Sequence, residues 1–177
     1  KYIGGHSDIM LGVSVANKKY LPQLKRWRIN SGQSVGPDDV FLALRGLRTL
    51  PLRLSKSFEN SKKIAIFFSK QQDIKNVFHP ALKNHPDHDL WKRDFKGASG
   101  IFGIEFNQKV PEKAVEYFAD QCQLFGKGAS WGGFESLMTM TDLVNNRTLK
   151  NSYLPDGPYL RIYVGLENIE DLIYDLD

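Results

Sequence analysis

The sequence has little cysteine and no long apolar run. A single cysteine among 177 residues, Cys122, excludes a disulfide within the chain, and a reducing compartment fits this. No apolar stretch approaches the roughly 20 residues of a membrane helix. The residues after Lys1 do not form a signal peptide. We therefore expect a cytoplasmic protein with no membrane partner.

An excess of charge of one sign is also missing. The 24 lysines and arginines and the 20 aspartates and glutamates leave a net charge of +4. The basic pairs Lys18-Lys19 and Lys25-Arg26 are short and are typical of a solvated face. We expect no nucleic-acid partner.

The sequence does not offer a complete set of metal ligands. His79, His85 and His88 lie close together in the sequence. No cysteine or well-spaced set of carboxylates completes the four ligands that zinc requires. We expect no metal site.

Residues 1–48 and 49–177 differ in character. The first part is rich in glycine, and its apolar run over residues 9–16 is long enough for a buried strand. A helix is predicted over residues 21–27, and Pro37 begins another.

The second part alternates helices and strands. Apolar residues at steps of three and four, from Leu47 to Phe68, predict a long helix that ends near Ser69 and links two domains. Periodicity and turn signals predict the remaining elements: strands over residues 74–78, 100–106 and 159–165, a helix over 111–125, and a last helix capped by Asn168.

A lysine begins the first of four motifs with chemical meaning. Lys1 precedes a glycine-rich polar loop that contains Gly5-His6-Ser7-Asp8. A lysine amine that is partly removed from water suits Schiff-base chemistry, because only the neutral amine is nucleophilic. His6 alone is interpreted as a structural histidine in a turn.

The other three motifs follow in residues 45–50, 130–137 and 160–167. In residues 45–50, Arg45 and Arg48 are predicted to form ion pairs at the domain junction. Residues 130–137 contain two glycines between aromatic residues, which permit backbone angles or close approach that a side chain forbids. Residues 160–167 place Arg161 among apolar neighbours, where it needs an anionic partner such as a substrate carboxylate.

These segments, in this order and spacing, resemble the trans-sulfuration (Cys/Met metabolism) family of enzymes dependent on pyridoxal phosphate (PLP). The resemblance covers nearly the whole chain. It implies an α/β protein of PLP-dependent transferase fold type I, which is aspartate aminotransferase-like. Residues 1–48 would be the C-terminal end of the PLP-binding domain, and residues 49–177 a C-terminal α+β domain with a long linking helix, a small sheet and covering helices.

The resemblance also implies roles for single residues. Lys1 would hold the cofactor, pyridoxal 5'-phosphate, covalently and act in catalysis, while Arg161, Ser130 and Trp131 would bind the substrate. A homotetramer, a dimer of dimers, is expected. Because the family's other cofactor contacts lie upstream of this lysine, we expect the chain to be a fragment that works with the missing N-terminal portion of the same protein.

One residue narrows the reaction. Trp131, directly after Ser130, is similar to the bacterial cystathionine β-lyases, whereas γ-acting relatives usually carry a smaller aliphatic residue there. This predicts a carbon–sulfur lyase that converts cystathionine to homocysteine, pyruvate and ammonia in methionine biosynthesis. The alternatives are a γ-acting relative (cystathionine γ-lyase, cystathionine γ-synthase or methionine γ-lyase) and, from another class, a non-catalytic assembly module. The presence of both Lys1 and Arg161 argues against the module.

Overall fold

The computed structural model describes residues 1–149 and 153–177. Its helices are α1 (Leu21–Ser31), α2 (Pro37–Leu47), α3 (Leu50–Phe68), α4 (His88–Asp94), α5 (Glu112–Gln121), α6 (Leu143–Asn146) and α7 (Ile169–Leu176). Its strands are β1 (Ile74–Phe78), β2 (Ile101–Phe106), β3 (Gly126–Lys127), β4 (Leu137–Met140) and β5 (Tyr159–Tyr163).

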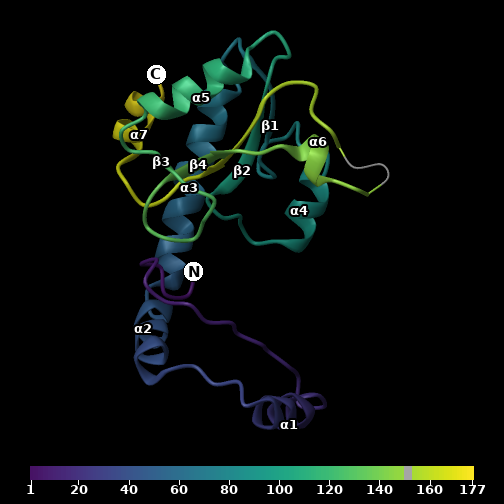
Figure 1. Cartoon of the computed structure of the whole chain (residues 1–177), viewed down its shortest axis with the longest axis vertical. Helices are drawn as coiled ribbons and strands as arrows, with labels where there is room; N and C mark the ends of the chain where they lie inside the picture. Colours follow the sequence, from purple (N-terminus) through teal and green to yellow (C-terminus); the bar gives the residue numbers. More distant parts are fainter. Residues whose placement is uncertain (150–152) are drawn as a thin grey trace.

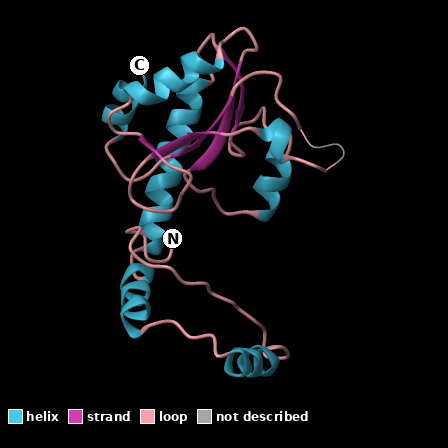
Figure 2. Cartoon of the chain, in the orientation of Figure 1, coloured by secondary structure: helices cyan, strands magenta, loops and turns pink. Residues whose placement is uncertain are grey.

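The strands of the described residues form one mixed sheet in the order β1-β2-β5-β4-β3 (Figures 1 and 2). Neighbouring strands are antiparallel except β3 and β4, which are parallel. The central strand β5 pairs with β2 and β4, so that Arg161 lies between Gly103 and Thr139 in register.

The hydrophobic core lies on one face of this sheet. Phe102, Ile104, Leu160 and Ile162 are buried in one cluster, as the period of two along a strand requires. Helices α3, α5 and α7 pack against this face (Figure 1). Their apolar stripes add Ile64, Ala65, Phe68, Val115, Ala119, Ile169, Leu172 and Leu176 to the cluster.

The opposite face of the sheet carries polar and aromatic side chains. Glu105 pairs with Tyr159 in register, and Arg161 and Tyr163 follow at steps of two along β5. Because alternate residues of a strand point to the same face, these side chains form a row from one end of β5 to the other. The sheet thus separates the apolar core from a line of polar groups.

Most elements predicted for residues 49–177 are confirmed. The long helix is α3, with a proline in its first turn, and β1, β2 and β5 lie where periodicity predicts strands. Asn168 caps α7 by accepting hydrogen bonds from the backbone N–H groups of Glu170 and Asp171. The division into domains at residue 48 stays a prediction.

The strand predicted for residues 9–16 is wrong. This segment forms neither helix nor strand, and Met10 and Val15 are each 92% exposed. A strand needs neighbouring backbone for its N–H and C=O groups. Within the described part of the chain, this segment runs outside the sheet toward α1 (Figure 1).

The helix predicted over residues 111–125 ends earlier, at Gln121. The carboxylate of Asp175 accepts hydrogen bonds of 2.7 to 3.2 Å from the backbone N–H groups of Gln123, Leu124 and Phe125. Because these donors are bonded to Asp175, they do not continue the hydrogen-bond ladder of α5.

Helix α1 lies apart from the sheet and has no buried residue. The N-terminal loop, in contrast, lies beside the start of α3 (Figure 1). None of the helices formed by the described residues combines the length and apolar character needed to cross a bilayer.

Candidate active site

The N-terminal loop fixes the direction in which Lys1 leaves the backbone. The backbone N–H of Gly5 donates to the carbonyl of Lys1 at 2.7 Å, which closes the loop into a turn. Gly5 has a φ of 80°, a left-handed conformation that glycine adopts without steric strain.

Arg53 of α3 binds this loop to the helices. Its guanidinium donates to the carbonyls of Tyr2 at 2.7 Å, Ile3 at 3.0 Å and Gly46 at 2.8 Å. A planar group with five N–H donors suits several carbonyls at once. Arg53 therefore holds the lysine loop at the junction of α2 and α3.

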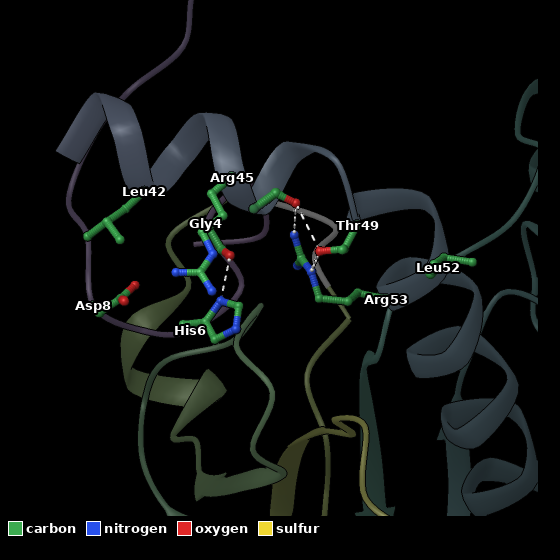
Figure 3. Close-up of a pocket in the computed structure, with 9 residues that line it drawn as sticks. Gly4, His6, Asp8, Leu42, Arg45, Thr49, Leu52 and Arg53 are labelled. Carbon is green, nitrogen blue, oxygen red and sulfur yellow. Dashed lines mark hydrogen bonds between the residues drawn. The ribbon is translucent and has the colours of Figure 1, made fainter. Parts of the chain in front are cut away.

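The ion pairs predicted for Arg45 and Arg48 are wrong for the part of the chain that the structure describes, because no carboxylate there lies within 4.0 Å of either guanidinium. Arg45 instead lines a hollow of about 520 Å³ together with His6 and Asp8 (Figure 3). His6 Nδ1 is hydrogen-bonded to the carbonyl of Gly4 at 2.9 Å, which agrees with a structural role in the turn.

The segment from Ala129 to Ser136 faces the lysine loop and is anchored to the sheet. The hydroxyl of Tyr163 donates to the carbonyl of Gly133 at 2.8 Å. The hydroxyl of Ser136 donates to Glu167 at 2.8 Å. These contacts fix the middle and the end of the segment against β5 and the chain that follows it.

The two glycines of this segment are needed, as the sequence predicts. Gly132 has a φ of 92°, which side chains rarely tolerate. A Cβ on Gly133 would lie 2.8 Å from Glu135 Oε2 and 3.1 Å from Lys1 Cε, and would also collide with Ser7 Oγ. Gly133 therefore provides the room in which these three side chains meet.

Lys1 joins the two segments. Its Nζ donates to Ser130 Oγ at 2.9 Å and lies 3.6 Å from Glu135 Oε1. The side chain of Lys1 is only 20% exposed. The structure thus brings together Lys1 and Ser130, two of the predicted site residues, and adds a carboxylate.

That carboxylate is held by the lysine loop itself. Ser7 Oγ donates to Glu135 Oε1 at 2.8 Å and to Oε2 at 3.1 Å. Burial opposes ionisation of Glu135, but hydrogen bonds from its own backbone and from Ser7, with the charge of Lys1, outweigh burial and hold its pKa below the usual value. Sequence reasoning missed both residues, although each lies within a recognised motif, because their contact joins segments 128 positions apart.

Arg161 completes the group from β5. Its Nη2 donates to the carbonyl of Ala129 at 2.5 Å, and its guanidinium lies 4.8 Å from the centroid of the Trp131 ring, within the range of a cation–π contact. Ala129, Ser130 and Trp131 are consecutive, so they connect Arg161 to Lys1. All four predicted site residues therefore lie around one short segment.

An open hollow of about 500 Å³ lies at this point, lined by Lys1, Tyr2, Ala129, Ser130 and Trp131. Its volume is within the roughly 300–1,000 Å³ of small-molecule sites. The similar hollow beside Arg45 has neither the lysine nor Ser130 in its lining. Of the predicted site residues, Lys1, Ser130 and Trp131 therefore line the hollow at Lys1.

Comparison with known families identifies the class of protein. All 177 residues match the family of Cys/Met metabolism PLP-dependent enzymes. The chain belongs to this family, which confirms both the resemblance and the cofactor predicted from the sequence.

Curated relatives match along the whole chain. A cystathionine beta-lyase of Haemophilus influenzae is 40% identical over 99% of this chain, and cystathionine beta-lyase MetC of Escherichia coli is 37% identical over 100%. An L-alanine/L-glutamate racemase of Wolbachia pipientis is 39% identical over 100%. The chain spans about 45% of the length of these relatives.

Solved structures confirm the predicted fold class, PLP-dependent fold type I. The crystal structure of cystathionine gamma synthase from Xanthomonas oryzae in complex with aminoacrylate and cysteine superposes with a TM-score of 0.87. It is 35% identical, and the match covers 99% of this chain and 46% of that one.

The residues around the hollow fit the family's cofactor. Covalent attachment of an aldehyde needs a primary amine that faces an open space, and Lys1 lines the hollow with its Nζ directed to Ser130. The missing side chain of Gly133 keeps the space around Lys1 Cε free. Lys1 is therefore the residue of this chain that would hold the cofactor.

Proposed function

We propose that the protein containing this chain is a PLP-dependent carbon–sulfur lyase. It converts cystathionine and one water to homocysteine, pyruvate and ammonia. The observation that carries this proposal is the stacking of Trp131 on Arg161 beside the hollow that Lys1 lines. The cystathionine beta-lyases among the relatives support the same reaction.

Lys1 acts as the general base in this proposal. When bound, PLP supplies an electron-accepting ring that stabilises negative charge developing at the α-carbon of the substrate. With substrate bound, the free amine of Lys1 removes the proton from this carbon. Ser130 accepts a hydrogen bond from Nζ, at 2.9 Å, and so directs the amine.

Arg161 binds the α-carboxylate of the substrate. Its hydrogen bond to Ala129 uses one of five N–H donors in the described contacts. A carboxylate takes two further donors in a bidentate pair. This orientation turns the bond between the α-carbon and its hydrogen toward Lys1.

Trp131 restricts the reaction to β-elimination. Elimination at the γ-carbon needs a second proton to be removed from the β-carbon, so a γ-acting enzyme must let the amine move between two carbons. The Trp131 ring is bulky and is held against Arg161. It therefore narrows the site and keeps the substrate in the pose from which only the α-proton is removed.

Product analysis tests this proposal. The intact protein, loaded with PLP, is incubated with cystathionine, and pyruvate is assayed against 2-oxobutyrate. We expect pyruvate and homocysteine, with little 2-oxobutyrate or free cysteine. Mainly 2-oxobutyrate would leave the family assignment intact and overturn the β-lyase assignment.

Two comparisons define the other outcomes to be measured. The cystathionine gamma synthase structure makes a γ-acting enzyme the second candidate. The Wolbachia racemase makes it necessary to incubate L-alanine and L-glutamate and to measure D-enantiomers by chiral chromatography. Absence of turnover with all of these substrates would favour the non-catalytic assembly module.

The proposal includes a cytoplasmic homotetramer in which residues 1–48 belong to the end of the PLP-binding domain. These residues carry exposed apolar side chains, including Met10 at 92%, Ile29 at 70% and Phe41 at 63%. Apolar surface of this kind marks contact with further protein. A strictly monomeric yet active protein in solution scattering would contradict the tetramer.

A further inference from the structure

We infer that Glu135, oriented by Ser7, is the counter-ion that stabilises the protonated amine of Lys1 during the reaction. The inference rests on the proposed role of Lys1 as the general base. It concerns a positioning residue, because Glu135 acts on the reaction through the charge of Lys1.

The geometry of the pair supports an electrostatic role. Glu135 Oε1 lies 3.6 Å from Lys1 Nζ, while Ser130 Oγ accepts the hydrogen bond of this amine at 2.9 Å. Both side chains of the ion pair are partly withdrawn from water, with 20% and 33% of their surface exposed. Their attraction is therefore screened less than that of a fully exposed pair.

Ser7 keeps the carboxylate in place and ionised. Its hydroxyl donates to both oxygens of Glu135, and a carboxylate that accepts hydrogen bonds is stabilised in its charged form. Ser7 has a φ of 59°, a left-handed backbone conformation that is uncommon outside glycine. Strain of this kind persists where the surrounding structure requires it, and it gathers at functional sites.

Gly133 makes the meeting of the three side chains possible. Glu135, Lys1 and Ser7 all approach the position that a Cβ on this glycine would occupy. The main chain is held there by the hydrogen bond from Tyr163 to the Gly133 carbonyl. The contact is therefore built from two fixed segments, and chance proximity of flexible side chains does not explain it.

The chemistry needs such a group. As the bond between the α-carbon and its hydrogen breaks, a bond from this hydrogen to Lys1 Nζ forms, and the amine becomes an ammonium ion. Glu135 takes no proton and keeps its negative charge throughout. Its charge lowers the free energy of the ammonium form, which exists only after the proton has been removed.

The test compares Glu135→Gln with wild type in two measurements on the intact protein. After release of the cofactor, the rate at which an amine-directed acylating reagent labels Lys1 Nζ is measured at one pH by peptide mass spectrometry. We expect about threefold faster labelling in Glu135→Gln, since the attraction within a partly exposed ion pair is modest. With cofactor and substrate bound, the acid limb of the kcat profile should move to lower pH, because kcat reports the enzyme–substrate complex, in which the amine of Lys1 is free, and the ammonium form has lost its counter-ion.

Three further variants separate charge from structure. Glu135→Asp keeps the charge and should restore the wild-type labelling rate. Ser7→Ala should shift the rate in the same direction as Glu135→Gln, by a smaller factor, and it serves if the glutamine variant does not fold. Glu112→Gln removes an exposed carboxylate from the first turn of α5 and should change nothing.

Labelling of Lys1 at the wild-type rate in folded Glu135→Gln and Ser7→Ala would overturn the inference. This assay needs no substrate, so its outcome is independent of the reaction. Failure of cystathionine cleavage together with a shifted labelling rate would refute the proposed reaction and support the counter-ion. Cleavage of cystathionine together with an unshifted labelling rate would support the proposed reaction and refute the counter-ion.

Discussion

Two carboxylates lie near the two ends of the sheet face that is opposite the core, and each is paired with a lysine. Glu105 is fully buried. It accepts hydrogen bonds from Lys75 at 3.2 Å, from Asn76 at 2.6 Å, from the backbone of Asp156 at 3.1 Å and from the hydroxyl of Tyr153. Burial opposes its ionisation, but these donors outweigh burial and hold its pKa below the usual value.

Glu135, near the other end, is paired differently. Its lysine lies 3.6 Å away, and the hollow of about 500 Å³ begins at that lysine. Its pKa is also lowered, against the effect of burial. Both ends thus hold an ionised carboxylate beside a lysine, yet one is closed by its donors and the other opens to a ligand-sized space. The two pairs therefore differ in their access to an open space, although each combines a glutamate with a lysine.

The largest expected effect tests the lysines of the two pairs. Lys1→Ala should lower product formation more than 10³-fold, about 4 kcal/mol, because no other group replaces the base and the cofactor attachment. Lys75→Ala should stay within twofold of wild-type activity. Steady-state kinetics measures both, and the visible absorption of the bound cofactor should change only in Lys1→Ala. A borohydride-reducible adduct at another lysine would contradict the assignment.

The second prediction tests the carboxylates by stability. Glu105→Ala should lower the free energy of unfolding by about 3 kcal/mol, since it leaves the side chains of Asn76 and Tyr153 and the backbone N–H of Asp156 without their buried acceptor. Glu135→Ala should lower it by less than about 1 kcal/mol, because that side chain is partly exposed. Urea unfolding followed by circular dichroism measures the difference. Equal losses would remove the distinction between the closed and open ends.

Periodicity explains why much of the fold could be predicted from the sequence. The apolar residues at steps of three and four in α3 and at every second position in β5 are local patterns that indicate which side of each element faces the core. The apolar run of residues 9–16 carries no such period. Whether it forms a strand depends on backbone neighbours elsewhere, and the described chain supplies none.

The candidate site was predictable only in part, because some of its residues act through contacts with residues far away in the sequence. Lys1 and Arg161 stand out because their chemistry is unusual in its surroundings. Glu135 and Arg53 act through contacts across 134 and 51 positions of sequence. Serine, glutamate and arginine are common surface residues, so only the fold identifies these as supports of the lysine loop.

The third prediction concerns the middle of the same face. Arg161→Lys should lower kcat/KM about 30-fold, roughly 2 kcal/mol, with a higher KM and a lower kcat, because an ammonium ion cannot reproduce a bidentate guanidinium. Arg93→Lys, at an exposed arginine paired with Asp94, is the control and should behave as wild type. A change within about threefold in Arg161→Lys would show that the carboxylate is bound elsewhere.

The smallest expected effect concerns Trp131, which lines the hollow at Lys1 and lies against Arg161. Trp131→Leu removes the ring from the guanidinium of Arg161 and widens the hollow, so the bound substrate gains freedom to move away from the β-productive pose. We expect kcat/KM for cystathionine to fall about tenfold, or 1.4 kcal/mol, and the share of 2-oxobutyrate among the products to rise. Trp131→Phe keeps an aromatic face for Arg161 and should fall less. Tyr174→Leu, at an exposed aromatic position on α7, is the control. If Trp131→Leu loses tenfold in rate while the product ratio stays at the wild-type value, Trp131 orients Arg161 and does not select the reaction. The difference between the open and closed ends would then lie in Lys1 and Arg161 alone.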